Sequence, residues 1–170
     1  MKTVFCFSIL ILCASFITNK ANAQHAGIFV HALYAAPMGG ISSDFYNGGA
    51  GGEGGVLAGK KFTRFVGSIG YSHFFSDNAN IYGDKTYIPV KAGVRQYLPL
   101  DIIFLQADAG VGFVSQKHSD NNTTPFAYDF QAGVKFGGFE GAIGWDTFHA
   151  SDFSGWSSWF TVKAGFNIGF

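Results

Sequence analysis

The final stretch of the chain alternates strictly between apolar residues and polar or small ones. Successive side chains of a β-strand point to opposite faces of the sheet, so strict alternation predicts a strand with one apolar and one polar face. The apolar positions are Phe160, Val162, Ala164, Phe166, Ile168 and Phe170, and the positions between them are Thr161, Lys163, Gly165, Asn167 and Gly169. The alternation ends on an aromatic residue.

Seven earlier segments show the same period of two and predict seven more strands. They cover residues 25–36, 51–60, 64–75, 86–97, 102–114, 125–136 and 139–146. Long polar connections near 37–50, 76–85, 115–124 and 147–156 alternate with short ones at 60–63, 98–101 and 137–138. Gly137-Gly138 suits a two-residue hairpin turn, where a positive φ is needed. The pattern predicts an all-β fold, an eight-stranded antiparallel up-and-down barrel.

Charge placement distinguishes a membrane barrel from a soluble, lipocalin-type barrel of the same strand number. Ten charged residues fall in the predicted strands, all on the less apolar face, with five of each sign: Glu53, Arg64, Lys91, Arg95, Asp108, Asp129, Lys135, Glu140, Asp146 and Lys163. The other charges after residue 23, Lys85 and Asp101 among them, fall in predicted loops and turns. A lipocalin-type core would bury the ten strand charges beside its ligand. In a transmembrane barrel they face the lumen, and no charge meets lipid, where Arg or Lys costs about 2–4 kcal/mol.

The lumen of an eight-stranded barrel is just wide enough for side chains to fill it. We expect the cations and anions to pair across it, because isolated buried charges are too costly. Inward glycines leave room for the long side chains, namely Gly93, Gly110, Gly112, Gly133, Gly144 and Gly165. Aromatic residues near strand ends are expected to form two interfacial girdles: Tyr34, Tyr71, Tyr87, Trp145, Trp159 and Phe170.

The N-terminus has the features of a secretory signal peptide over residues 1–23. Lys2 provides a positive start, an apolar run follows over 4–17, and Ala21-Asn22-Ala23 supplies the cleavage site. The predicted mature chain, 24–170, contains neither cysteine and therefore no disulfide or thiol chemistry. Its net charge of −2, from 9 basic and 11 acidic residues, gives no basic excess for nucleic acid.

The alternating strands, the Ala21-Asn22-Ala23 site and the terminal Phe170 together resemble the small bacterial outer-membrane β-barrel family, of the OmpX and OmpW type. The resemblance covers the whole mature chain. It implies a monomer in the outer membrane, with both mature termini in the periplasm and membrane lipids as partners. It also implies that Phe166, Ile168 and Phe170 form the signal that the outer-membrane assembly machinery reads. It implies no cofactor.

Candidate chemistry in the sequence is sparse. His25, His31, His73, His118 and His149 are scattered along the chain without metal-ligand spacing, so no metal site is predicted. His149-Ala150-Ser151 is similar to the His-x-Ser element of outer-membrane lipid A deacylases, which implies His149 as base and Ser151 as nucleophile. Asp152 stands where that element has Asn, however, and no downstream acid orients the histidine.

Aromatic residues in or beside the Gly, Ser and Asn-rich loops suit an adaptable binding surface: Tyr82, Phe126, Phe148, Phe153 and Trp156. We therefore expect a non-enzymatic barrel with a filled lumen and a structural or surface-interaction role. Two alternatives remain open. One is a narrow OmpW-like channel for small hydrophobic compounds, and the other is a lipid A deacylase using His149 and Ser151.

Overall fold

The structure is a computed structural model that describes residues 25–40, 46–60, 62–76, 83–98, 101–116, 119–150 and 155–170. Within these ranges no helix is long and apolar enough to cross a membrane. The predicted signal peptide lies outside the described residues and stays a prediction.

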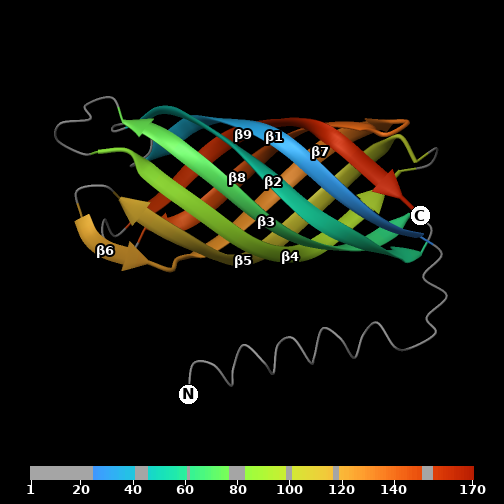
Figure 1. The fold of residues 1–170 in the computed structure, drawn as a ribbon, viewed down its shortest axis with the longest axis horizontal. Coiled ribbons are helices and arrows are strands. Elements are labelled where there is room, and N and C mark those ends of the chain that lie inside the picture. Colours follow the sequence, from blue (N-terminus) through green and yellow to red (C-terminus); the bar gives the residue numbers. More distant parts are fainter. Residues whose placement is uncertain are drawn as a thin grey trace, which may run out of the picture.

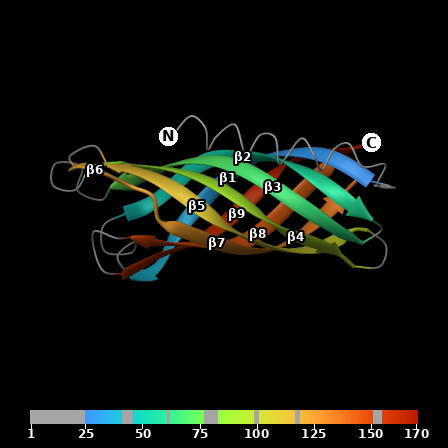
Figure 2. The same ribbon diagram turned by 90° about the horizontal axis from the view of Figure 1, so that it is seen from below.

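Eight long strands form one closed antiparallel barrel (Figures 1 and 2). They are β1 (His25–Gly40), β2 (Tyr46–Lys60), β3 (Thr63–Ser76), β4 (Lys85–Tyr97), β5 (Ile103–Gln116), β7 (Phe126–Phe136), β8 (Phe139–Ala150) and β9 (Gly155–Gly169). Each pairs with its neighbour in the chain, and β9 pairs with β1, where Val30 faces Phe166. The predicted eight-stranded up-and-down barrel is confirmed.

The predicted loops are too long at one end of the barrel. β1 continues to Gly40 and β2 begins at Tyr46, so the loop expected over 37–50 is mostly strand. A short strand, β6 (Ser119–Thr123), pairs with the end of β5 inside the loop expected over 115–124. β8 likewise runs on to Ala150 and β9 starts at Gly155. The ends of these strands are polar and do not alternate, so their sequence pattern is typical of loops although they are paired in the sheet. We call this end of the barrel the loop end.

Short turns connect the strands at the opposite end, which we call the turn end and where the C-terminus also lies (Figure 1). Gly137 has φ of 62°, as the predicted two-residue turn requires. Asp101, in the turn between β4 and β5, has φ of 56°. Asp is among the few non-glycine residues that tolerate this left-handed region.

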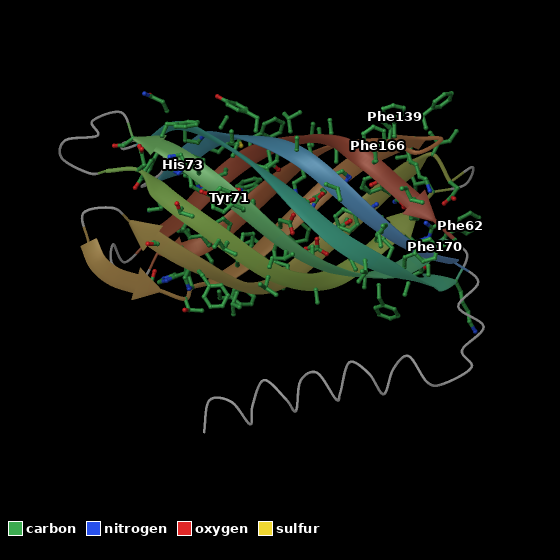
Figure 3. The ribbon with its side chains drawn as sticks, viewed as in Figure 1. Phe62, Tyr71, His73, Phe139, Phe166 and Phe170 are labelled. Carbon is green, nitrogen blue, oxygen red and sulfur yellow. The ribbon has the colours of Figure 1, made fainter. Side chains whose placement is uncertain are left out.

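The barrel is apolar outside and polar inside. In β9, Val162, Phe166 and Ile168 are exposed, whereas Thr161 and Lys163 are buried. Figure 3 shows labelled outward aromatics, among them Phe139 and Phe166, whose ring centroids are 4.6 Å apart. Among the charged side chains whose exposure the structure describes, Lys60 at the end of β2 is the exposed one, and the others are buried or half-buried. This polarity is the reverse of a soluble barrel and is what a lipid-facing barrel requires.

The predicted aromatic girdles are wrong for two of their six members. Tyr87 and Trp159 are only 2% and 1% exposed and lie inside the barrel. Their place near strand ends suggested an interface, but Tyr87 has the same strand parity as the buried Lys91, and Trp159 that of Lys163. In a strand, parity decides the face a side chain occupies. Tyr34, Tyr71, Trp145 and Phe170 do point outward.

Inward glycines stand in register with bulky inward side chains. Gly110 faces Lys91, Gly93 faces Asp108, Gly144 faces Gln131, and Gly165 faces His31 on β1. At Gly165 an added Cβ would collide with the carbonyl oxygen of Val30 and the Cα of His31. Because these glycines have no side chain, the neighbouring strand can approach closely and the large inward side chain opposite has room to extend into the lumen. Gly112 and Gly133, expected beside charged stems, instead make room for the rings of Tyr87 and Phe104.

A single methyl group at Gly165 should therefore destabilise the barrel. We expect Gly165→Ala to lower the free energy of unfolding by about 1–3 kcal/mol, the typical cost of overpacking. Gly54→Ala is the matched control, because its Cβ would point outward and meet Phe29 O at 3.5 Å, an ordinary contact. Urea titration of the micelle-folded protein, followed by tryptophan fluorescence, measures both. Equal stability of the two variants would contradict the close-approach argument.

Candidate functional site

Eight side chains of alternating charge form a continuous chain of contacts across the lumen, which we call the charged belt. It consists, in order, of Arg95, Glu140, His31, Glu53, Lys163, Asp129, Lys91 and Asp146, contributed by β1, β2, β4, β7, β8 and β9. The six inner members of the belt each contact two groups of opposite charge, and the end members, Arg95 and Asp146, each contact one. This arrangement is the condition under which charges are tolerated away from water.

His31 joins the two halves of the charged belt. Its Nδ1 lies 3.2 Å from Glu53 Oε1, and its Nε2 lies 3.0 Å from Glu140 Oε2. Carboxylate oxygens only accept hydrogen bonds, so both ring nitrogens must carry a hydrogen and the ring is an imidazolium. Sequence reasoning missed His31, because histidine was counted as neutral and considered only as a metal ligand. Its inward parity, opposite the buried Glu53 in the β1–β2 register, was the available signal.

Glu140 is the most heavily bonded acid of the charged belt. Its Oε1 accepts from Arg95 Nη1 at 2.7 Å and from Asn167 Nδ2 at 2.7 Å, and its Oε2 faces His31. The Tyr97 hydroxyl also reaches Oε1, at 3.4 Å. These partners come from β1, β4 and β9, so one carboxylate on β8 ties together strands on different sides of the barrel.

The other half of the charged belt centres on Lys91 and Lys163. Lys163 Nζ donates to Glu53 Oε2 at 2.8 Å and lies 3.5 Å from Asp129 Oδ2. Lys91 Nζ donates to Asp146 Oδ2 at 3.0 Å and lies 3.3 Å from Asp129 Oδ1. Asp129 is thus shared by two ammonium groups, both almost fully buried.

Asp108 is the remaining buried acid of the ten predicted strand charges. It stands opposite Asp129 in the β5–β7 register and accepts from the Gln106 amide. Gln106 in turn accepts from Arg95 Nε, which links Asp108 to the charged belt through an uncharged side chain. Arg64 and Lys135 lie apart from the belt at the turn end, where Arg64 Nη2 is 3.3 Å from Asp101 Oδ2.

Five inward aromatic side chains pack together nearer the loop end, and we call them the aromatic plug: Tyr46, Phe74, Tyr87, Phe148 and Trp159. Trp159 stacks on Phe74 with ring centroids 3.9 Å apart, and Tyr87 stacks on Phe148 at 4.6 Å. Tyr46 lies 5.9 Å from Trp159 and 6.4 Å from Phe74. The lumen therefore contains two successive layers of contacting side chains, one ionic and one aromatic.

Two predictions about the loop end are wrong. Lys85 was expected in a loop, but it opens β4, is only 4% exposed, and places its Nζ 4.9 Å from the centre of the Tyr46 ring. Phe148 was expected as a loop-surface anchor, but it is buried in the aromatic plug. Both have inward parity. Phe126 and Trp156 are exposed, and the predicted anchors Tyr82 and Phe153 lie outside the described residues.

The two weak catalytic candidates gain no support from the geometry. His149 lies in β8, and its ring packs edge-on against Trp156 at 5.1 Å. Ser151 lies outside the described residues, as does Asp152. No carboxylate among the described residues lies within ion-pair distance of His149. In the described part of the chain, no three His, Cys, Asp or Glu side chains are grouped so that they could hold a metal ion.

Solved structures share this fold. The attachment invasion locus protein Ail of Yersinia pestis aligns with a TM-score of 0.60 at 15% identity, over 85% of this chain and 98% of its own. Neisserial surface protein A (NspA) aligns with a TM-score of 0.56 at 10% identity, over 85% and 95%. The N-terminal β-barrel domain of Pseudomonas aeruginosa OprF gives 0.55 at 11% identity, over 84% and 97%. The expected resemblance to small outer-membrane β-barrels is confirmed at the level of fold.

Comparisons of sequence give no match. No family model matches the chain, and no curated protein does.

Removing one charge of the belt should destabilise the barrel strongly. We expect Glu140→Gln to lower the free energy of unfolding by about 3–5 kcal/mol, because Arg95 and His31 are left buried with too little negative charge. Asp84→Asn is the matched control, since its partner His73 is at 3.4 Å in a pair about one-third exposed. Such pairs contribute about 0–1 kcal/mol.

Urea unfolding of the micelle-folded protein measures both variants. Adding Arg95→Gln to the Glu140→Gln protein should restore part of the loss, since the uncompensated guanidinium is then removed as well. A loss below about 1 kcal/mol for Glu140→Gln would contradict the role given to the belt.

Proposed function

We propose that the chain is an exported outer-membrane β-barrel whose lumen does not conduct and whose role is structural or lies in interactions at the cell surface. The observation that carries this proposal is the pair of filled layers in the lumen. A solute crossing the barrel would have to break the charged belt and also displace the aromatic plug. In this proposal the loop end faces the outside of the cell and the turn end the periplasm.

The outer surface supports a membrane location. Large exposed apolar side chains recur along seven of the eight long strands, for example Val30, Phe65, Val94, Phe130 and Val162, while the glycine-rich β2 contributes Val56. A soluble protein rarely exposes an apolar area this continuous. Membrane lipids are therefore the proposed partners of this surface, and a barrel surrounded by lipid needs no second copy to cover it. The backbone of Ail, a fold neighbour, was determined in a phospholipid bilayer nanodisc.

The outward apolar residues of β9 are the proposed assembly signal. Phe166, Ile168 and Phe170 are 56%, 59% and 75% exposed and lie on one face at the turn end. Because β9 also closes the barrel against β1, a machinery that binds this face would hold one of the two strands at the seam. Both strand ends at the seam are then proposed to be periplasmic.

A surface role is supported by the fold neighbours rather than by a site in this chain. One neighbour is described as an attachment invasion locus protein and another as a surface protein. The alternative of a narrow channel for small hydrophobic compounds is disfavoured, because it needs an apolar path through the lumen and the charged belt interrupts one. No observation favours the lipid A deacylase.

The closed lumen makes a direct electrical prediction. The protein reconstituted in a planar bilayer should give no large, steady conductance. Trp159→Ala alone should also remain closed, because the charged belt still fills the barrel below the aromatic plug. Trp159→Ala combined with Glu140→Ala and Arg95→Ala should conduct, since both layers are then opened. Trp145→Ala, on the outer face, is the control for loss of a tryptophan.

A large, steady conductance of the unmodified protein would overturn the closed-lumen proposal. Silence of the triple variant would count against the two layers as the barrier, provided that its folded band survives in unheated gels.

A further inference from the structure

A cavity of about 540 Å³ opens at the turn end, separate from the charged belt. Its lining includes Ala26, Arg64, Asp101, Lys135, Asn167 and Phe170. The volume lies within the usual range of small-molecule sites. We call this cavity the turn-end vestibule.

Arg64 provides a buried guanidinium with unused donor capacity at the vestibule. The side chain is only 4% exposed, and its guanidinium lies 4.2 Å from the centre of the Tyr97 ring. Nη2 lies 3.4 and 3.3 Å from the two carboxylate oxygens of Asp101, which are long contacts for charged groups. Nε is buried and donates to no group in the described part of the protein. Asp101 thus satisfies one edge of the guanidinium weakly and leaves another free.

Lys135 provides a second cation at the vestibule. Its Nζ lies 6.0 Å from the centre of the Tyr97 ring that Arg64 also contacts, and both side chains line the cavity. No carboxylate among the described residues lies within ion-pair distance of it. The side chains at the cavity carry two positive charges and one negative charge, that of Asp101, and the α-carboxylate of Phe170 adds a second negative charge to the lining.

Asn167 also lines the cavity, but its amide is engaged elsewhere. Its Nδ2 donates to Glu140 Oε1 at 2.7 Å. Its Oδ1 can only accept a hydrogen bond and therefore offers nothing to an oxyanion. The cationic donors at the cavity are Arg64 and Lys135.

We propose that the turn-end vestibule binds a small oxyanion, a phosphate or carboxylate group, through Arg64 and Lys135. The guanidinium presents several donors in a fixed plane that matches such oxygens, and the ammonium adds a point charge. Asp101 acts as a built-in competitor that occupies Arg64 weakly when no anion is bound. This site is independent of the proposed closed lumen and surface role.

Arginine side-chain NMR tests the proposal directly, because the sequence contains only two arginines, Arg64 and Arg95. Labelling the protein with ¹⁵N-arginine gives two Nε–Hε signals in detergent micelles. Inorganic phosphate and acetate are titrated separately, with chloride at equal ionic strength as the salt control. We expect a saturable shift of the Arg64 signal with phosphate, acetate or both, and no shift of Arg95, whose Nε already donates to Gln106. The more effective probe identifies the anion class.

Three variants separate binding from general electrostatics. Lys135→Gln should weaken the anion about ten-fold, the effect of losing one charged hydrogen bond. Asp101→Asn should tighten it, because the competing carboxylate is gone while Asn still tolerates the left-handed φ at this turn. Lys60→Gln removes a charge at the same end of the barrel but outside the cavity, and should change nothing.

The proposal is overturned if neither probe gives a saturable shift of Arg64. It is also overturned if chloride produces the same shift, or if Lys60→Gln weakens binding as much as Lys135→Gln. The last two results would mean that the Arg64 signal responds to ionic strength or to the net charge of this end of the barrel, and not to a bound anion.

Discussion

The barrel depends on charge pairing inside a lumen too narrow for much water. An eight-stranded barrel in a membrane must turn its polar face inward, and the interior is only as wide as the side chains that fill it. Buried charges there are tolerated when they meet opposite charges or, as Asp108 does with Gln106, hydrogen-bond donors. The charged belt meets this condition by alternating signs from Arg95 to Asp146 over six strands. The strand register, the inward glycines and the position of the aromatic plug are all compatible with that one arrangement.

His31 shows how strict the condition is. Without a positive charge at His31, Glu53 would retain Lys163 and Glu140 would retain Arg95, but the two halves of the belt would no longer be joined. The imidazolium supplies the bridging cation and uses both of its nitrogens to do so. Gly165 lies directly opposite His31 on β9. Because Gly165 has no Cβ, the backbone of β1 at His31 can approach β9 closely. A glycine and a histidine on neighbouring strands thus depend on each other.

Much of the fold was predictable because a membrane barrel encodes its faces in a period of two. Strand number, the order of short and long connections, the seam between β1 and β9 and the polarity of the two faces all follow from alternation and turn residues. The wrong side-chain placements arise where position near a strand end or the polarity of neighbouring residues is given more weight than the parity of the residue in its strand. The positions of Tyr87 and Trp159 near strand ends suggest an interface, and the polar neighbours of Phe148 and Lys85 suggest loops, yet all four side chains have inward parity and are buried.

The partners inside the lumen were not predictable from the sequence. Glu140 meets Arg95 and His31 because of the barrel's curvature and the shift between distant strands, neither of which alternation specifies. The turn-end vestibule likewise depends on closure, which brings Arg64 of β3 and Lys135 of β7 to the lining of one cavity. The alternation in the sequence predicts which face of the barrel a side chain occupies. Which side chain it contacts across the lumen depends on how the strands close into the barrel.

Cell fractionation combined with gel mobility before and after heating is the decisive measurement for a membrane barrel. A folded outer-membrane barrel resists SDS until it is boiled, so the protein should be found in the outer-membrane fraction and its band should shift on heating. Recovery of the protein entirely in the soluble periplasmic fraction, with one band at all temperatures, would contradict a membrane barrel.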